Sequence, residues 1–230
     1  MRVIAGYVEN DANMADDHWS VAWTFDLGFW GVCGQGPDES AAVAALGRLT
    51  GRSIEVVERI TGDEQAFGRD FDPATDTERA ATQRILDDVR PQTVEFLRAC
   101  PDDLLDWDDP DRVLPPHARW RTLRLMGWHV ADTECRYYLP SLGLPAKPRD
   151  AELMAELRTS HDFVQTAVAT MPGDLVHRDR GEVWTTTKVL RRLAWHERGE
   201  LAAMRDLAVR YPVRSIAGPA DPGSSGGTPR

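Results

Sequence analysis

Residues 183–204 read VWTTTKVLRRLAWHERGELAAM, and this stretch decides how the second half of the chain folds. One stripe of residues follows steps of three and four, which is the helical period: Val189, Leu193, His196, Glu200, Ala203 and, just beyond the stretch, Leu207. We therefore predict a long amphipathic helix over 182–211, stopped before Pro212. His196 and Glu200 lie on the same stripe, one turn apart, so both are expected to point toward the interior.

Three earlier segments carry the same period and are separated by turn-forming residues. They cover residues 77–100, 117–139 and 150–171. Pro91 is expected to kink or interrupt the first of them, because proline removes a helical hydrogen bond. Four amphipathic helices bury their stripes by packing on one another, so residues 70–211 are predicted to form a four-helix bundle.

The first 65 residues follow a different pattern. Short runs rich in β-branched and aromatic residues, such as HWSVAWTFDL at 18–27, predict strands, and the Ala-rich run after Asp38 predicts a helix. We interpret residues 1–65 as a β-β-β-α-β module, which makes the fold class α+β. Residues 212–230 are rich in Gly, Pro and Ser and are predicted to form a disordered tail.

Composition narrows the classes of function. The chain has 230 residues, of which 42% are hydrophobic, and a net charge of -10, so we expect a globular protein that does not bind nucleic acid. No apolar run approaches the roughly 20 residues that span a bilayer, and the amino terminus does not resemble a secretory signal, so a cytoplasmic location without membrane contact is predicted. Cys33, Cys100 and Cys135 form no C-x-x-C pair, which argues against a disulfide framework or a thiolate zinc cluster.

The polar residues on the predicted inner stripes are the candidates for chemistry. His196 and Glu200, at i and i+4, can bind one divalent ion, and His129 on the second helix is the natural third ligand across the bundle. The spacing permits this site without requiring it, because His129 and Glu200 could also form a polar network that fixes packing. His161 on the third helix competes for the role of ligand, with a hydrogen-bonded core histidine as the alternative.

Two segments resemble the DinB-like (DinB/YfiT) family of metal-binding four-helix bundles. The matching residues of the last helix are Trp184, Thr185, Lys188 to Arg192, and His196 to Arg198. Residues 122–134 are similar to the family segment that donates the first histidine, and the resemblance spans about residues 70–211. Glu200 departs from the commoner pattern, which has a second histidine there, although carboxylate is itself a good ligand for zinc, nickel or manganese.

The resemblance implies a metal-dependent enzyme, in particular a thiol S-transferase that uses a low-molecular-weight thiol such as mycothiol or bacillithiol. It implies His129, His196 and Glu200 as ligands of the metal, which leaves open positions for water or substrate. A metal-dependent hydrolase, and a non-catalytic binding or stress-related regulatory protein with a degenerate site, stay open as alternatives. The expected partner is a small-molecule substrate, and a homodimer stays open.

Further residues near the candidate ligands have two interpretations each. Glu197 and Asp132 either orient a ligand imidazole or are ordinary surface carboxylates. Arg136 and Arg198 either hold an anionic substrate or face solvent. The two tryptophans that precede proposed ligands, at positions 128 and 195, are predicted to seal the bundle against neighbouring helices or the amino-terminal module.

The amino-terminal module resembles the HicB-like antitoxin fold. The residues that carry this resemblance are Ile4 to Tyr7, Trp23 to Leu27, and Gly34 to Gly36 ahead of Asp38. The resemblance implies a ligand-binding, partner-binding or dimerising accessory rather than a nuclease, because no catalytic histidine or acidic cluster accompanies it.

Overall fold

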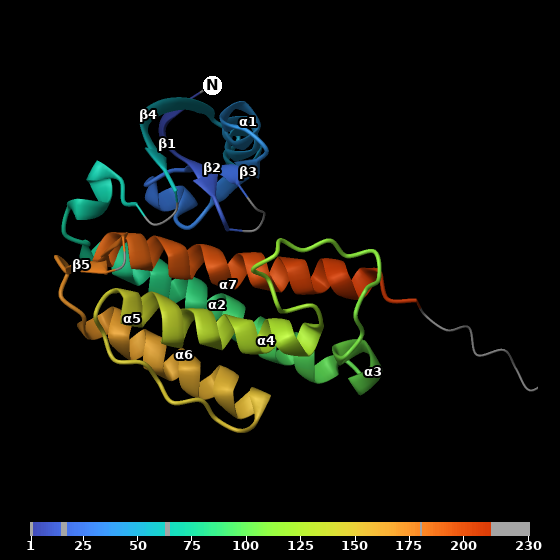
Figure 1. Cartoon of the computed structure of the whole chain (residues 1–230). Helices are drawn as coiled ribbons and strands as arrows, with labels where there is room; N and C mark the ends of the chain where they lie inside the picture. Colours follow the sequence, from blue (N-terminus) through green and yellow to red (C-terminus); the bar gives the residue numbers. More distant parts are fainter. Residues whose placement is uncertain (1, 15–17, 63–64, 180, 213–230) are drawn as a thin grey trace, which may run out of the picture.

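The computed structural model describes residues 2–14, 18–62, 65–179 and 181–212, so most of the predicted tail, 213–230, lies outside the described residues. A small sheet with one helix lies over a bundle of four long helices (Figure 1). The module contains β1 (Val3–Ala12), β2 (Trp19–Trp23), β3 (Cys33–Gly36), α1 (Glu39–Thr50) and β4 (Ser53–Thr61). The predicted β-β-β-α-β order is confirmed.

The four strands have the order β3-β2-β1-β4, and α1 packs on one face of the sheet while the bundle covers the other. Strands β1 and β2 pair antiparallel, as do β2 and β3, whereas β1 and β4 pair parallel. Alternate residues therefore face opposite sides: Ala22 packs beneath α1, and Trp23 packs toward the bundle. A Cβ at Gly34 would lie 2.2 Å from the backbone nitrogen of Leu46, so only glycine allows α1 to approach β3 this closely.

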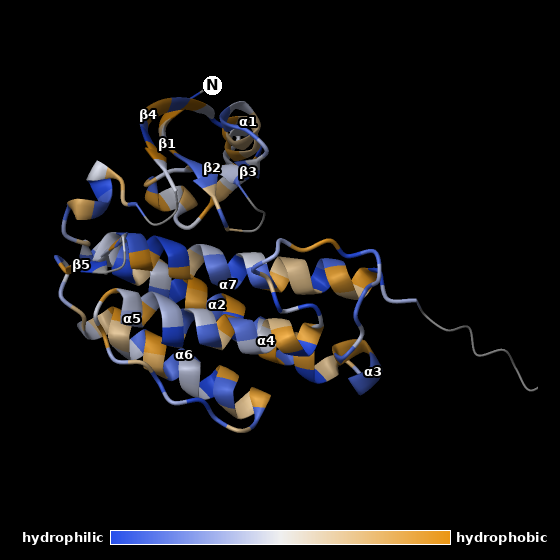
Figure 2. Ribbon diagram, in the orientation of Figure 1, coloured by the Kyte–Doolittle hydropathy of each residue, from blue (hydrophilic) through white to orange (hydrophobic). Residues whose placement is uncertain are grey.

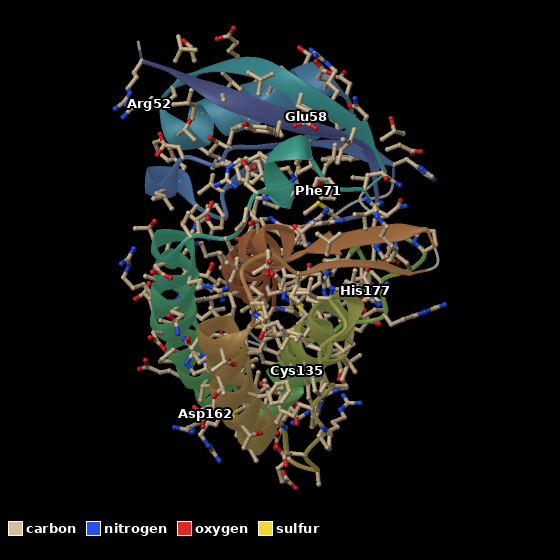
Figure 3. All side chains as sticks on the ribbon, turned by 90° about the vertical axis from the view of Figure 1, so that its left-hand side faces the viewer. Arg52, Glu58, Phe71, Cys135, Asp162 and His177 are labelled. Carbon is tan, nitrogen blue, oxygen red and sulfur yellow. The ribbon has the colours of Figure 1, made fainter. Side chains whose placement is uncertain are left out.

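The bundle is built from α2 (Asp76–Ala99), α4 (Leu123–Asp132), α6 (Leu153–Thr170) and α7 (Thr186–Val209). A π-helical turn, η3 (Thr133–Tyr138), and the short α5 (Leu139–Ser141) continue α4 without a break. The remaining elements are two 3-10 turns, a short helix and a hairpin: η1 (Leu27–Phe29), η2 (Gly68–Phe71), α3 (Asp102–Leu105), β5 (Val176–Asp179) and β6 (Glu182–Thr185). Figure 3 shows Cys135 in the interior of the bundle and Asp162 on its outer surface. The α+β class and the four-helix bundle are thus confirmed.

Helix α2 continues through Pro91 without interruption, which leaves a kink as the open one of the two predicted effects; burial of its stripe on both sides of the proline outweighs one lost hydrogen bond. Two bounds of the predicted helices are wrong. The second helix begins at Leu123, where the Thr122 side chain caps it by accepting from the Leu125 amide, and not at position 117. Residues 182–185 form β6, and Thr185 then caps α7 by accepting from the Lys188 amide.

The described chain contains no helix that is long and apolar enough to cross a bilayer. The three cysteines are free, as predicted.

Buried ion pairs fix the module on α7. Arg191 and Arg192 are 0% and 3% exposed, and Figure 2 shows hydrophilic residues along the part of α7 that lies beneath the sheet. The Arg192 guanidinium donates to Glu9 of β1 at 2.9 Å, and that of Arg191 donates to Asp70 of η2 at 3.0 Å. The indole of Trp23 also meets the ring of Trp195 edge-on, with 6.0 Å between centroids. The module and the bundle therefore share one continuous buried interface.

Candidate metal centre

His129, His196 and Glu200 form a cluster between α4 and α7. Each offers one ligand atom, and these atoms all lie within 4.8 Å of one another. The Nε2 atoms of the two histidines are 3.3 Å apart, and Glu200 Oε1 is 3.7 Å from each of them. The structure thus brings together the three residues that the sequence singled out.

Burial makes the charged forms of all three groups unfavourable. It lowers the pKa of His129 to about 2 and that of His196 to about 3, and it raises the pKa of Glu200 to about 8. Without a cation the cluster therefore holds neutral imidazoles and a protonated carboxyl at neutral pH. A divalent cation would favour the deprotonated carboxylate and the neutral imidazoles, which are the forms that bind metals.

The donor set fits a divalent metal. Glu200 Oε2 is buried and has no hydrogen-bond partner among the described residues. An unpartnered buried oxygen costs free energy, so its presence beside two imidazole nitrogens calls for a ligand. Two imidazoles and one carboxylate suit zinc, and nickel or manganese also accept this combination.

The carboxylate of Glu134 faces the side of His196 that points away from the cluster. Glu134 Oε1 lies 3.8 Å from His196 Nδ1, both groups are buried, and neither atom has a hydrogen-bond partner among the described residues. His196 therefore turns Nε2 toward the cluster and Nδ1 toward Glu134. A carboxylate that accepts a hydrogen bond from the second nitrogen of a ligand imidazole orients the ring, and Glu134 lies just beyond hydrogen-bond distance of Nδ1.

Arg90 holds this carboxylate in place. Its guanidinium lies 2.6 Å from Glu134 Oε2 and also contacts the Glu197 carboxylate. Arg90 is itself anchored by donating to the Leu157 carbonyl and the Ser160 hydroxyl, at 2.8 and 2.9 Å. Burial raises the pKa of Glu197 to about 7, with Arg90 opposing that rise.

His129 is held by its neighbours on both sides. The Trp120 indole stacks on its ring, with 3.4 Å between centroids and 8° between planes. The Thr133 hydroxyl, one turn along the helix, lies 3.2 Å from its Nδ1. These contacts fix the plane of the imidazole and keep Nε2 directed toward the cluster.

The cluster opens into a pocket of about 570 Å³. Three parts of the chain line it: the bundle, through residues such as Tyr138 and Trp195; the loop that precedes α4; and the amino-terminal module. The loop contributes Arg112, His117 and Trp120. A pocket of this size accommodates a small organic molecule beside the cluster.

Several other expectations from the sequence are resolved by the structure. His161 Nε2 donates to the Asp87 carboxylate at 3.1 Å and lies outside the cluster, so it is a hydrogen-bonded histidine. Asp132 pairs with Arg136 at 2.7 Å, and Arg198 donates to the Trp30 carbonyl. The two arginines do not line the pocket, and no contact between Asp132 and a ligand imidazole is found among the described residues, so the structure gives these side chains partners away from the cluster.

The remaining neighbours of the ligands have structural roles. Glu197 pairs with Arg90, and no contact between Glu197 and a ligand imidazole is found among the described residues; the carboxylate that faces Nδ1 of His196 is Glu134 instead. Trp195 packs against the module and the partly buried Trp128 packs against the core of the bundle, as predicted, with the Arg149 guanidinium 4.1 Å from the Trp128 ring centroid. Sequence reasoning missed Glu134, although steps of four from Met126 and Val130 place it on the buried stripe of this helix.

Comparisons with known proteins add one similarity. No protein-family model matches this sequence, and no curated protein does. Among solved structures, the chain is similar to YfiT from Bacillus subtilis, described as a probable metal-dependent hydrolase with an unusual four-helix bundle topology. The match covers 60% of this chain and 90% of that chain, with a TM-score of 0.47 and 19% sequence identity. The HicB-like resemblance of the module stays a prediction.

Proposed function

We propose that this protein is a divalent-metal-dependent enzyme that acts on a small molecule held in the pocket. One observation carries the proposal: His129, His196 and Glu200 converge at the wall of a cavity of about 570 Å³. Three ligands on the protein side leave the cavity side open to a further ligand. A cation bound there would lower the pKa of a thiol or a water molecule in its open position, which makes either a nucleophile near neutral pH.

The pocket lining favours a thiol over water. Glu200, itself a proposed ligand, is the only carboxylate among the described lining residues, so no other carboxylate there can assist a water nucleophile as a general base. A thiol bound to the cation would lose its proton outright and needs no such base. We therefore favour transfer of a small thiol to an electrophile, in line with the thiol S-transferase activity and the mycothiol or bacillithiol cosubstrate that the sequence resemblance implies.

Arg112 gives the pocket a positive charge. Its guanidinium is held by donating to the Trp120 and Arg121 carbonyls, at 3.2 and 2.9 Å. Burial lowers the pKa of Arg112, and the nearby Glu200 opposes that effect. A guanidinium remains charged in such a site, so the pocket is suited to a substrate that carries an anionic or strongly polar group.

A metal-dependent hydrolase is the second candidate, and His117 favours it. This imidazole lies on the exposed loop at the pocket wall, with its ring centroid 6.4 Å from that of Trp120. It is the one histidine among the described lining residues that is not a proposed ligand, and it could accept a proton from water.

Absorption spectroscopy of the Co²⁺-loaded protein tests both candidates. We expect one Co²⁺ per chain in the wild type, and a sulfur-to-cobalt charge-transfer band on addition of a small thiol. His161→Ala is the matched control, because His161 is a partly buried histidine outside the cluster, and it should behave as the wild type. His196→Ala should lose both signals. A wild type that binds no Co²⁺ would contradict the proposal. Bound Co²⁺ that gives no charge-transfer band with thiols would favour the hydrolase.

A further inference from the structure

The amino-terminal module contributes one wall of the pocket. Asn13 and Met14, which follow β1, and Gln35 of β3 line the same cavity as His129, His196 and Glu200. The bundle alone would leave this side of the cavity open. The module is therefore part of the candidate site, although none of these three residues belongs to the metal cluster itself.

The wall is held rigidly against the ligands. Strand β1 is tied to α7 through the buried pair of Glu9 and Arg192, four residues before His196. Gly31, between β2 and β3, sits so close to α7 that a Cβ on it would lie 2.6 Å from the Cβ of Ala194. With the Trp23–Trp195 contact, these interactions fix the position of β3 relative to the metal ligands.

Two carboxamides on this wall have uncommitted polar groups. Asn13 Oδ1 accepts a hydrogen bond from the His18 amide at 3.2 Å, and no hydrogen bond of its NH₂ group to another described residue is found. The Gln35 NH₂ group makes a weak contact with Cys33 Sγ at 3.8 Å, and Gln35 Oε1 accepts no hydrogen bond from the described residues. The wall therefore offers one donor and one acceptor, with the apolar Met14 beside Asn13.

We propose that Asn13 and Gln35 form a subsite for an amide group of the substrate, whose other end reaches the metal cluster. An amide presents one N–H donor and one carbonyl acceptor, which complement Gln35 Oε1 and the Asn13 NH₂ group. The subsite rests on the proposed function, because the metal cluster anchors the reacting end. It gives the module a role in choosing the substrate: the site prefers molecules that carry a peptide-like amide over apolar molecules of the same length.

A matched pair of hydroxamates tests the subsite without relying on turnover. Pentanohydroxamate and N-acetylglycine hydroxamate have chains of equal length and the same metal-binding group, and only the second carries an amide within its chain. Each is titrated into the Co²⁺-loaded full-length protein, and its dissociation constant is read from the d–d absorption bands. We expect the wild type to bind N-acetylglycine hydroxamate about tenfold more tightly, the gain of one to two hydrogen bonds.

Three variants locate the preference. Gln35→Leu removes the acceptor, and Asn13→Asp removes the donor while keeping Oδ1 for the His18 amide, so each should lose most of the preference. Both variants should keep the wild-type affinity for Co²⁺, and Gln35→Leu should also keep the wild-type affinity for pentanohydroxamate. Gln83→Leu is the matched control, because Gln83 is a partly buried glutamine of α2 outside the pocket, and it should keep the full preference.

The outcomes separate this inference from the proposed function. Absence of the Co²⁺ spectrum in the wild type would overturn the metal site and the subsite with it. A normal Co²⁺ spectrum with equal affinity for the two hydroxamates would overturn the subsite alone. A preference that survives in both Gln35→Leu and Asn13→Asp would overturn the assignment to these two residues.

Discussion

Helix α7 carries two buried polar clusters, one turn apart, and only the first of them pairs guanidiniums with carboxylates. In the first, the guanidiniums of Arg191 and Arg192 lie against the carboxylates of Asp70 and Glu9. In the second, His196 and Glu200 meet His129, and no guanidinium or ammonium of the described residues forms an ion pair with any of the three. The first cluster supplies its own counter-charges, and the second does not.

This difference separates a structural cluster from a candidate functional one. A buried charge is costly without its partner, so the first cluster ties the module to the bundle. The second holds its groups in neutral forms and leaves Glu200 Oε2 without a partner among the described residues. Such groups persist in a folded protein when a bound ligand completes them.

Breaking the first cluster is expected to have the largest effect on stability. Glu9→Ala removes the carboxylate that faces Arg191 and Arg192, so it should lower the free energy of unfolding by about 3–5 kcal/mol, measured by urea denaturation. Glu39→Ala is the control, because it breaks an exposed pair with Arg59 and should cost less than about 1 kcal/mol. An equally small loss in Glu9→Ala would show that the first cluster does not hold the module.

The second cluster should respond to pH through Glu200. Its folded pKa of about 8 exceeds the ordinary value of 4.5, so the folded metal-free protein binds more protons than the unfolded chain between these values. The stability of metal-free protein should therefore fall as pH rises through this window. Metal must displace the same proton, so its affinity should rise about tenfold per pH unit below pH 8 and level off above it.

Glu200→His sharpens the pH prediction. The imidazoles of His129 and His196 stay neutral above about pH 3, so a three-histidine site should keep metal without the rise in affinity between pH 6.5 and 8. Competition titrations with Zn²⁺ between pH 6.5 and 8 measure the metal affinity of both proteins. The same slope in wild type and Glu200→His would mean that Glu200 is not the group that loses the proton.

A smaller effect is expected from the carboxylate behind His196. Glu134→Gln weakens the partner of Nδ1 while keeping its shape, so metal affinity should fall about 10–100-fold. Glu156→Gln is the matched control, since Glu156 is also fully buried and pairs with Arg136 and Lys147 away from the cluster. It should lower stability and leave metal affinity unchanged. If both variants bind metal alike, Glu134 does not orient His196.

The order of elements and the ligand cluster could be predicted because both depend on local periodicity. The step of four between His196 and Glu200 placed them on one face of α7, and the apolar neighbours of His129 placed it on the inner face of α4. Hairpin β5–β6 was missed because Trp184 and Thr185 stand directly before a helix of matching period.

The rest of the pocket depends on contacts between distant parts of the chain. Trp120 reaches His129 through a loop without periodicity, and Gln35 reaches the pocket only because β3 packs over α7. Arg136 and Arg198 were open to two interpretations, as substrate ligands or as solvent-facing residues, and the structure gives them partners within the chain. The Asp132–Arg136 pair has the local i,i+4 spacing, whereas local sequence carries no signal for the pairing with Glu156 or with the Trp30 carbonyl.

The metal content of the wild type and of His196→Ala tests the central claim most directly. Both proteins are purified without a metal-affinity tag, incubated with Zn²⁺, freed of excess ion and measured by elemental analysis, with far-ultraviolet circular dichroism to follow the helices. We predict one ion per chain in the wild type and almost none in His196→Ala, with the helical signal unchanged. Stoichiometric metal in His196→Ala, or none in the wild type, would contradict the assignment of His129, His196 and Glu200 as a metal site.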